Sequence, residues 1–131
     1  MSEEIVKALR AVFEQFARGD FSAYAALPDE FELVIAPEMP DAGTYRGEAA
    51  QRWLNSWIDS FERLTQEAVD FVDAGDRVVV EMIQRGWPRQ GASKPVEIRN
   101  WALNTVRDGA IVRSELFLTR AEALEAAGLR D

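Results

Sequence analysis

The segment at residues 96–118 constrains the fold most strongly, because it contains two runs rich in Val, Ile, Trp, Leu, Phe and Thr. These side chains suit a pleated, half-buried surface. Asp108 and Gly109 separate the runs, and this dipeptide accepts the positive φ angles of a tight hairpin turn. The preceding stretch at residues 77–87 is long enough to pair with the hairpin. The sequence therefore predicts a sheet, with the N-terminal helices packed on one of its faces.

Two helical segments are predicted near the N-terminus. Apolar residues recur at three- and four-residue spacing over residues 3–18, which is typical of an amphipathic helix, and Gly19 ends it. Asp20 can cap a second, short helix, which Pro28 closes. Both segments precede every predicted strand, so they are available to cover one face of the sheet.

A third helix is predicted over residues 47–64. Trp53, Trp57 and Phe61 fall on one helical line within it and form a broad apolar wall. Such a wall can pack into a core or line a ligand cavity, and the sequence leaves both interpretations open.

The C-terminal segment predicts a last helix that begins at Thr119. Thr119 and Glu122 have the spacing of a capping box. Gly128 can supply the left-handed residue that ends the helix, and Leu129 is then expected to fold back on Leu124.

Three further strands are predicted at residues 31–36, 67–72 and 77–87. Proline and glycine mark loops at residues 37–44 and 88–95. The order of elements is therefore helix, helix, strand, helix and then four strands, with a short helix at the end.

Alternation along these strands divides their side chains between two faces. The set expected to point inward is Leu33, Ile35, Val80, Met82, Gln84, Asn100, Ala102, Asn104, Ser114 and Leu116. The apolar members of the outer set are Val79, Ile83, Trp101, Leu103 and Phe117. So much apolar surface is usually covered, by a second copy or by a C-terminal tail or helix. The charged members are Glu81, Glu97 and Glu115, with Arg85, Arg99 and Arg113 as possible cross-strand partners.

Length and charge limit the partners of the chain. Its 131 residues are the size of one ordinary domain, so a single domain over residues 1–131 is expected. A content of 47% hydrophobic and 29% charged residues is typical of a globular protein. No apolar run approaches the roughly 18 residues of a membrane span. A membrane is therefore not an expected partner. The formal charge of −8 repels phosphate backbones, so a nucleic acid is not an expected partner either.

Cysteine and histidine are both absent from the sequence. The chain therefore has no disulfide, thiol nucleophile, imidazole base, or histidine or thiolate ligand for a metal ion. Its acids show no calcium-loop spacing, so we expect neither a metal nor another cofactor. A cysteine-free chain suits a reducing compartment and the N-terminus has no apolar signal core, so a cytoplasmic location is expected.

Four segments of the chain resemble the SnoaL-like (polyketide-cyclase-like) family of the nuclear transport factor 2-like superfamily. They read GTYRGEA at residues 43–49, DAGDRVVV at 73–80, RDGAIV at 107–112 and RAEALEAAGL at 120–129. The resemblance covers nearly the whole chain. It implies an α+β cone, in which a curved, mostly antiparallel sheet and the N-terminal helices enclose a pocket. It also implies a homodimer through the outer face of the sheet.

The same resemblance indicates where catalytic groups would stand. Polyketide cyclases use an inward acid on the last strand, where this chain has Leu116. Limonene-epoxide hydrolases use an inward Arg and Asp on the long strand, at the positions of Met82 and Gln84. Ketosteroid isomerases need an inward base near Leu33 and Ile35, and scytalone-dehydratase chemistry needs histidine. None of these four arrangements is present, so no catalytic residue can be assigned.

The expected interior is an apolar pocket with a few neutral polar groups. Amides and hydroxyls of this kind orient a ligand by hydrogen bonds, or satisfy one another or a buried water. We therefore expect an apolar small molecule with a polar group as the ligand. The residues expected to bind it are Leu33, Ile35, Trp53, Trp57, Met82, Gln84, Asn100, Asn104, Ser114 and Leu116.

Two other functions are left open by the sequence. Glu38 and Asp41 lie between the first strand and Tyr45, and a carboxylate beside apolar walls at the pocket mouth could serve an isomerase, hydrolase or cyclase. In the second alternative, side chains fill the pocket and the protein is a non-catalytic, dimeric interaction module.

Overall fold

The computed structural model describes residues 2–89 and 94–129 of the chain. Its helices are α1 (Ser2–Ala17), the 3₁₀-helix η1 (Ser22–Ala26), α2 (Glu48–Asp59) and α3 (Arg120–Ala126). Its strands are β1 (Glu32–Ile35), β2 (Gly43–Arg46), β3 (Phe61–Asp73), β4 (Arg77–Pro88), β5 (Val96–Arg107) and β6 (Ala110–Phe117). The predicted α+β class is confirmed.

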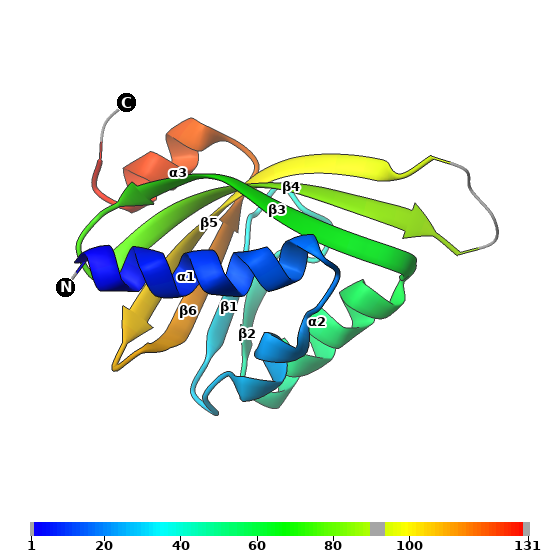
Figure 1. Cartoon of the computed structure of the whole chain (residues 1–131), viewed down its shortest axis with the longest axis horizontal. Helices are drawn as coiled ribbons and strands as arrows, with labels where there is room; N and C mark the ends of the chain where they lie inside the picture. Colours follow the sequence, from blue (N-terminus) through cyan, green and yellow to red (C-terminus); the bar gives the residue numbers. More distant parts are fainter. Residues whose placement is uncertain (1, 90–93, 130–131) are drawn as a thin grey trace.

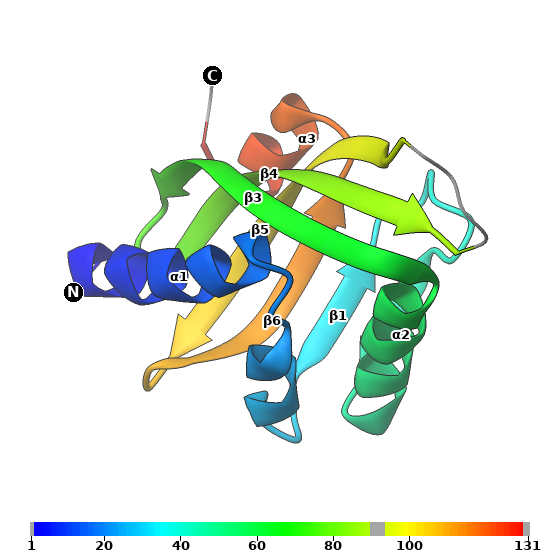
Figure 2. The same cartoon turned by 45° about the vertical axis from the view of Figure 1, so that its right-hand side comes forward.

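These strands form one sheet in the order β2-β1-β6-β5-β4-β3. Only β1 and β6 pair in parallel; the other neighbours are antiparallel, so the sheet is mixed and mostly antiparallel. The sheet is strongly curved, with α1, η1 and α2 on one side and α3 on the other (Figures 1 and 2). We call the side covered by α1, η1 and α2 the inner face.

The predicted hairpin is confirmed as β5 and β6. Arg107 pairs with Ala110 across a two-residue turn. Asp108 and Gly109 have φ angles of 50° and 79° there, as a turn with two left-handed residues requires. β4 pairs with β5 from Arg77 to Gly86, which also confirms the predicted long strand.

The predicted first helix is confirmed as α1, and its apolar stripe packs on the inner face. Leu9, Phe13 and Phe16 are buried against Val80 and Met82 of β4. Gly19, with a φ of 82°, ends this segment as expected. Burial of these side chains, rather than helix propensity, supplies most of the stability of such a helix.

The predicted third helix is wrong beyond Asp59. α2 ends there, and β3 begins at Phe61 and runs well ahead of the predicted strand at residues 67–72. Pairing with β4 overrides the helical spacing, because Phe61 lies opposite Pro88 and its ring covers the bare backbone of Gly86. A Cβ atom at Gly86 would overlap this ring. Phe61 still contacts Trp57 edge to face, with ring centroids 5.1 Å apart.

Two short elements also differ from the prediction. The second helix is a single 3₁₀ segment, η1, and the Asp20 side chain accepts a hydrogen bond from the Ser22 N–H at 3.0 Å. The loop predicted at residues 37–44 partly forms β2, which pairs with the predicted first strand, β1. Of the loop predicted at residues 88–95, residues 90–93 lie outside the described residues.

The outer face is covered in part by α3. Ala123, Leu124 and Ala127 pack on Val79 and Leu103, which are almost fully buried. Within one chain, the C-terminal helix therefore covers part of this face. This was one of the covers that the sequence left open.

The ends of α3 have the predicted caps. The Thr119 side chain accepts from the Glu122 N–H, and the Leu129 N–H donates to the Leu124 carbonyl at 2.8 Å. The guanidinium of Arg77 donates to the carbonyls of Ala126 and Ala127, which ties the helix to the start of β4.

Candidate functional site

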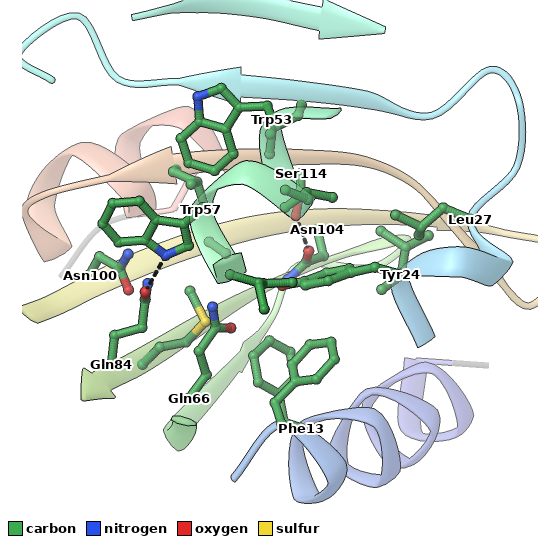
Figure 3. Close-up of a pocket in the computed structure, with 18 of the residues that line it drawn as sticks. Phe13, Tyr24, Leu27, Trp53, Trp57, Gln66, Gln84, Asn100, Asn104 and Ser114 are labelled. Atoms are coloured by element: carbon green, nitrogen blue, oxygen red, sulfur yellow. Dashed lines mark hydrogen bonds between the residues drawn. The ribbon is translucent and has the colours of Figure 1, made fainter. Parts of the chain in front are cut away.

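A cavity lies between the inner face of the sheet and the layer formed by α1, η1 and α2 (Figure 3). It offers about 80 Å³ to the centres of water-sized spheres. A cavity of about 150 Å³ binds benzene, so this cavity holds a few waters with its side chains in place and admits a ring-sized ligand when lining side chains shift.

All the residues predicted to bind a ligand except Ile35 line this cavity. They are Leu33, Trp53, Trp57, Met82, Gln84, Asn100, Asn104, Ser114 and Leu116. Ile35 lies on the same face but is buried among Phe31, Ala50 and Leu54, between β1 and α2. The strand alternation thus located the wall of the cavity, while ligand binding by these residues stays a prediction.

Several lining residues were not predicted. The N-terminal helices contribute Phe13, Phe16, Tyr24 and Leu27, and the sheet adds Gln66, Ile98 and Ile111. Gln66 was missed because it fell just beyond the overlong third helix, and because a register shift between Phe61 and Arg63 changes the alternation of β3, which the sequence does not reveal. No periodic signal marks Tyr24, because η1 is a single 3₁₀ segment.

Polar groups lie at two places on the cavity wall. At the end of α2, the Trp57 indole Nε1 donates to Gln84 Oε1 at 2.7 Å. Further along the sheet, Ser114 Oγ donates to Asn104 Oδ1. Both pairs are visible as dashed lines in Figure 3. The side chains of Gln84 and Asn104 are therefore held in place by neighbours on other elements.

The two asparagines of β5 keep unsatisfied polar atoms. Asn100 Oδ1 and Asn104 Nδ2 are buried and have no hydrogen-bond partner. Their residues are only 3% and 2% exposed. A buried polar atom without a partner costs roughly 1–3 kcal/mol, so a ligand that paired these atoms would recover that free energy.

Tyr24 is the only titratable residue among the described residues that line the cavity. Burial raises the pKa of its phenol, and a side-chain hydrogen bond with Gln66 opposes that rise in pKa. The phenol is therefore neutral at physiological pH and acts as a hydrogen-bond donor or acceptor, not as a charge.

The loop acids that could have supplied catalysis lie elsewhere. Glu38 and Asp41 are exposed and do not line the cavity. The Tyr45 hydroxyl donates to the backbone carbonyl of Asp41 at 2.8 Å, and not to its carboxylate. Within the described part of the chain, the lining contains no Asp, Glu, Lys or Arg, and no three metal-binding side chains come together. The geometry thus provides apolar contact and neutral hydrogen bonds.

On the outer face, two of the predicted cross-strand ion pairs form. Arg85 pairs with Glu97 at 3.2 Å, and Arg99 pairs with Glu81. Arg113 lies 3.6 Å from Glu115 on its own strand, and its cross-strand partner is Glu32 of β1 at 3.2 Å, which the sequence did not indicate. The charges within these ion pairs therefore compensate one another.

The comparisons with known proteins agree with this geometry. The family model of the SnoaL-like domain matches residues 9–114, which is most of the chain. The chain belongs to the SnoaL-like domain family. No curated protein matches this SnoaL-like protein.

Solved structures show the same fold at low sequence identity. An NTF2-like protein of unknown function from Burkholderia pseudomallei has a TM-score of 0.70 and 19% identity, with 92% of this chain and 95% of that chain covered. A hypothetical protein with a ketosteroid isomerase-like fold from Catenulispora acidiphila, in complex with trimethylamine, has a TM-score of 0.64 and 20% identity, covering 97% and 94%. TerC co-crystallised with polyporic acid has a TM-score of 0.69 and 20% identity, covering 95% and 98%.

These likenesses establish the NTF2-like fold and leave the activity to be argued from the site. Among the described residues, no helix is long and apolar enough to cross a membrane.

Proposed function

We propose that this SnoaL-like protein binds a small, largely apolar molecule in the cavity beneath α1, η1 and α2. The observation that carries the proposal is the lining itself. Aromatic and aliphatic side chains form most of it, and Gln66, Gln84, Asn100, Asn104 and Ser114 add neutral polar groups. This combination is typical of ligand sites, in which apolar contact supplies affinity and a few polar groups fix orientation.

The structural neighbours support this proposal. Two proteins of the same fold, TerC and the Catenulispora acidiphila protein, were crystallised with polyporic acid and trimethylamine. The open space between α2 and the sheet also favours binding over the alternative of a pocket filled by its own side chains. Trp53 and Trp57 line this space opposite Met82 and Leu116, instead of closing it.

Acetophenone is a suitable first probe, because it is uncharged, largely apolar and no larger than one substituted ring. We expect saturable binding by isothermal titration calorimetry, and loss of that binding in Ala102→Phe, which fills the middle of the cavity wall. Ala110→Phe, at the less buried start of β6, is the matched control. Absence of saturable binding to the wild-type protein, together with no co-purified molecule in native mass spectrometry, would refute the proposal.

We also infer that the protein forms a homodimer through the outer face beside α3. The ion pairs of this face contain arginines and acids in equal number: Arg46, Arg85, Arg99, Arg113 and Arg120 with Glu32, Asp70, Glu81, Glu97 and Glu115. The whole chain carries a formal charge of −8. Two copies can therefore approach through these paired charges with less like-charge repulsion than through surfaces whose acids are unpaired.

Light scattering during size-exclusion chromatography tests the dimer. We expect twice the 14.7 kDa mass of the chain, and a shift toward the monomer in Arg99→Glu, because this change adds two negative charges to the face on each copy. Arg52→Glu on the exposed side of α2 is the control. A wild-type monomer at tens of micromolar would refute the inference. The cytoplasmic location and the single domain over residues 1–131 stay predictions.

A further inference from the structure

We propose that the ligand is an uncharged molecule of about one substituted ring, with a hydrogen-bond acceptor for Asn104 Nδ2 at one end and a hydroxyl for Asn100 Oδ1 at the other. This inference rests on the proposed function and specifies the chemistry of the ligand in the same cavity. Four observations carry it: the two unpartnered atoms, their spacing, the absence of charge in the lining, and the size of the cavity.

The two unpartnered atoms require two different hydrogen-bonding groups on the ligand. Asn104 accepts the Ser114 hydroxyl through Oδ1, which leaves Nδ2 as a free donor. Asn100 Oδ1 is a free acceptor. A carbonyl or ether oxygen satisfies the free donor and a hydroxyl satisfies the free acceptor, so the ligand needs both kinds of group.

The spacing of the two amides separates the polar ends of the ligand. Asn100 and Asn104 lie four residues apart on β5 and line the same cavity, so their Cα atoms are about 13 Å apart along the strand. The ligand therefore needs its two polar groups at opposite ends, as a ring with substituents at opposite positions provides.

The surface between the amides suits a flat, apolar body. Ala102 lies midway between them on β5, and its short side chain leaves space above the strand at that point. Leu116 pairs with Ala102 from β6, and Met82 pairs with Asn100 from β4. Figure 3 shows the Trp57 ring beside Gln84 and Asn100, so an aromatic surface is available near the Asn100 end of the ligand.

Charge and size exclude larger or ionised ligands. The described lining residues carry no ionised side chain, so an ion would lose its hydration without gaining a counter-charge. The cavity is also smaller than the roughly 150 Å³ that holds benzene, so it excludes a ligand of three or four fused rings more strongly than a single ring.

Three probes test this inference by calorimetry at pH 6: 4-hydroxyacetophenone, acetophenone and 4-hydroxybenzoate. The first has both polar groups and is neutral, the second lacks the hydroxyl, and the third carries a carboxylate. We expect 4-hydroxyacetophenone to bind about 3- to 10-fold more tightly than acetophenone, because one buried hydrogen bond is lost in the latter. Binding of 4-hydroxybenzoate is expected to be at least tenfold weaker than that of 4-hydroxyacetophenone.

Leucine substitutions show which asparagine binds which polar group of the ligand. In Asn100→Leu, the two ketones are expected to bind equally, because the acceptor for the hydroxyl is gone. In Asn104→Leu, both ketones are expected to weaken by a similar factor, because both lose the donor to the carbonyl. Asn55→Leu, on the exposed side of α2, is the matched control and leaves all three affinities unchanged.

The outcomes separate this inference from the proposed function. Equal binding of the two ketones to the wild-type protein, or tighter binding of the benzoate, would overturn the inference while the cavity remains a ligand site. Failure of every probe to bind would overturn the inference, and it would overturn the proposed function as well if native mass spectrometry also shows no co-purified molecule. The comparison of three probes on the wild-type protein needs no variant, so it remains decisive even if a leucine variant does not fold.

Discussion

Removing the indole N–H of Trp57 tests the connection between α2 and the sheet at the edge of the cavity. Trp57→Phe keeps an aromatic ring but leaves Gln84 Oε1 without its donor at 2.7 Å, in a residue that is only 6% exposed. We expect a loss of about 1–3 kcal/mol in the free energy of unfolding, because the acceptor stays buried and unpaired. With a urea m-value of about 1–3 kcal/mol/M, the unfolding midpoint should fall by roughly 1 M.

A double-mutant cycle isolates the hydrogen bond from the lost ring area. Gln84→Met replaces the acceptor with an apolar side chain of similar length, so Trp57→Phe should cost about 0.5–1.5 kcal/mol less in that background. Trp53→Phe is the matched control, since Trp53 stacks on Trp57 with centroids 6.0 Å apart and should be additive with Gln84→Met. If Trp57→Phe is also additive, the hydrogen bond does not couple α2 to β4 and this reasoning is wrong.

Three further predictions concern the core, the hairpin and Tyr24. Leu124→Ala should lower the free energy of unfolding by about 2–5 kcal/mol in urea titrations, because α3 buries this side chain against the outer face, whereas exposed Glu125→Ala should change it little. Gly109→Ala should cost about 1 kcal/mol in the same assay, because its φ of 79° strains any residue with a Cβ atom while nothing lies within 4 Å to clash; a neutral result would contradict the turn geometry. Burial raises the pKa of Tyr24, so the folded state holds this proton more tightly than the unfolded state. That contribution to stability is complete below about pH 10 and is lost as the pH rises further, and Tyr24→Phe should flatten the fall in the unfolding midpoint between pH 9 and 11.

Much of the scaffold could be predicted because its signals are local. The Asp108-Gly109 turn requires two left-handed residues, which the dipeptide tolerates, and the hairpin formed where it was predicted. The stripe of α1 and the caps of α3 also depend on residues within one or two turns. The cavity wall followed from the hairpin, because a strand with known ends has a fixed alternation.

The errors occurred where distant pairing competed with a local pattern. Phe61 continues the helical spacing of Trp53 and Trp57, yet it belongs to β3, because β4 provides backbone partners and Gly86 leaves room for the ring. The same boundary concealed Gln66 from the candidate site. No local signal could reveal that Tyr24 reaches the cavity from η1, since its position depends on how the N-terminal layer closes over the sheet.

The sequence by itself determined the hairpin, the principal helices, the inward polar set of β5 and β6, and the absence of cysteine and histidine chemistry. These properties depend on residue type and on spacing within a few positions. Only the tertiary structure decided where α2 gives way to β3, that α3 covers Val79 and Leu103, and that Glu38 and Asp41 stay outside the cavity. It also decided which amide atoms are left without partners, because hydrogen-bond satisfaction depends on side chains brought together from separate elements, such as Ser114 with Asn104 and Trp57 with Gln84.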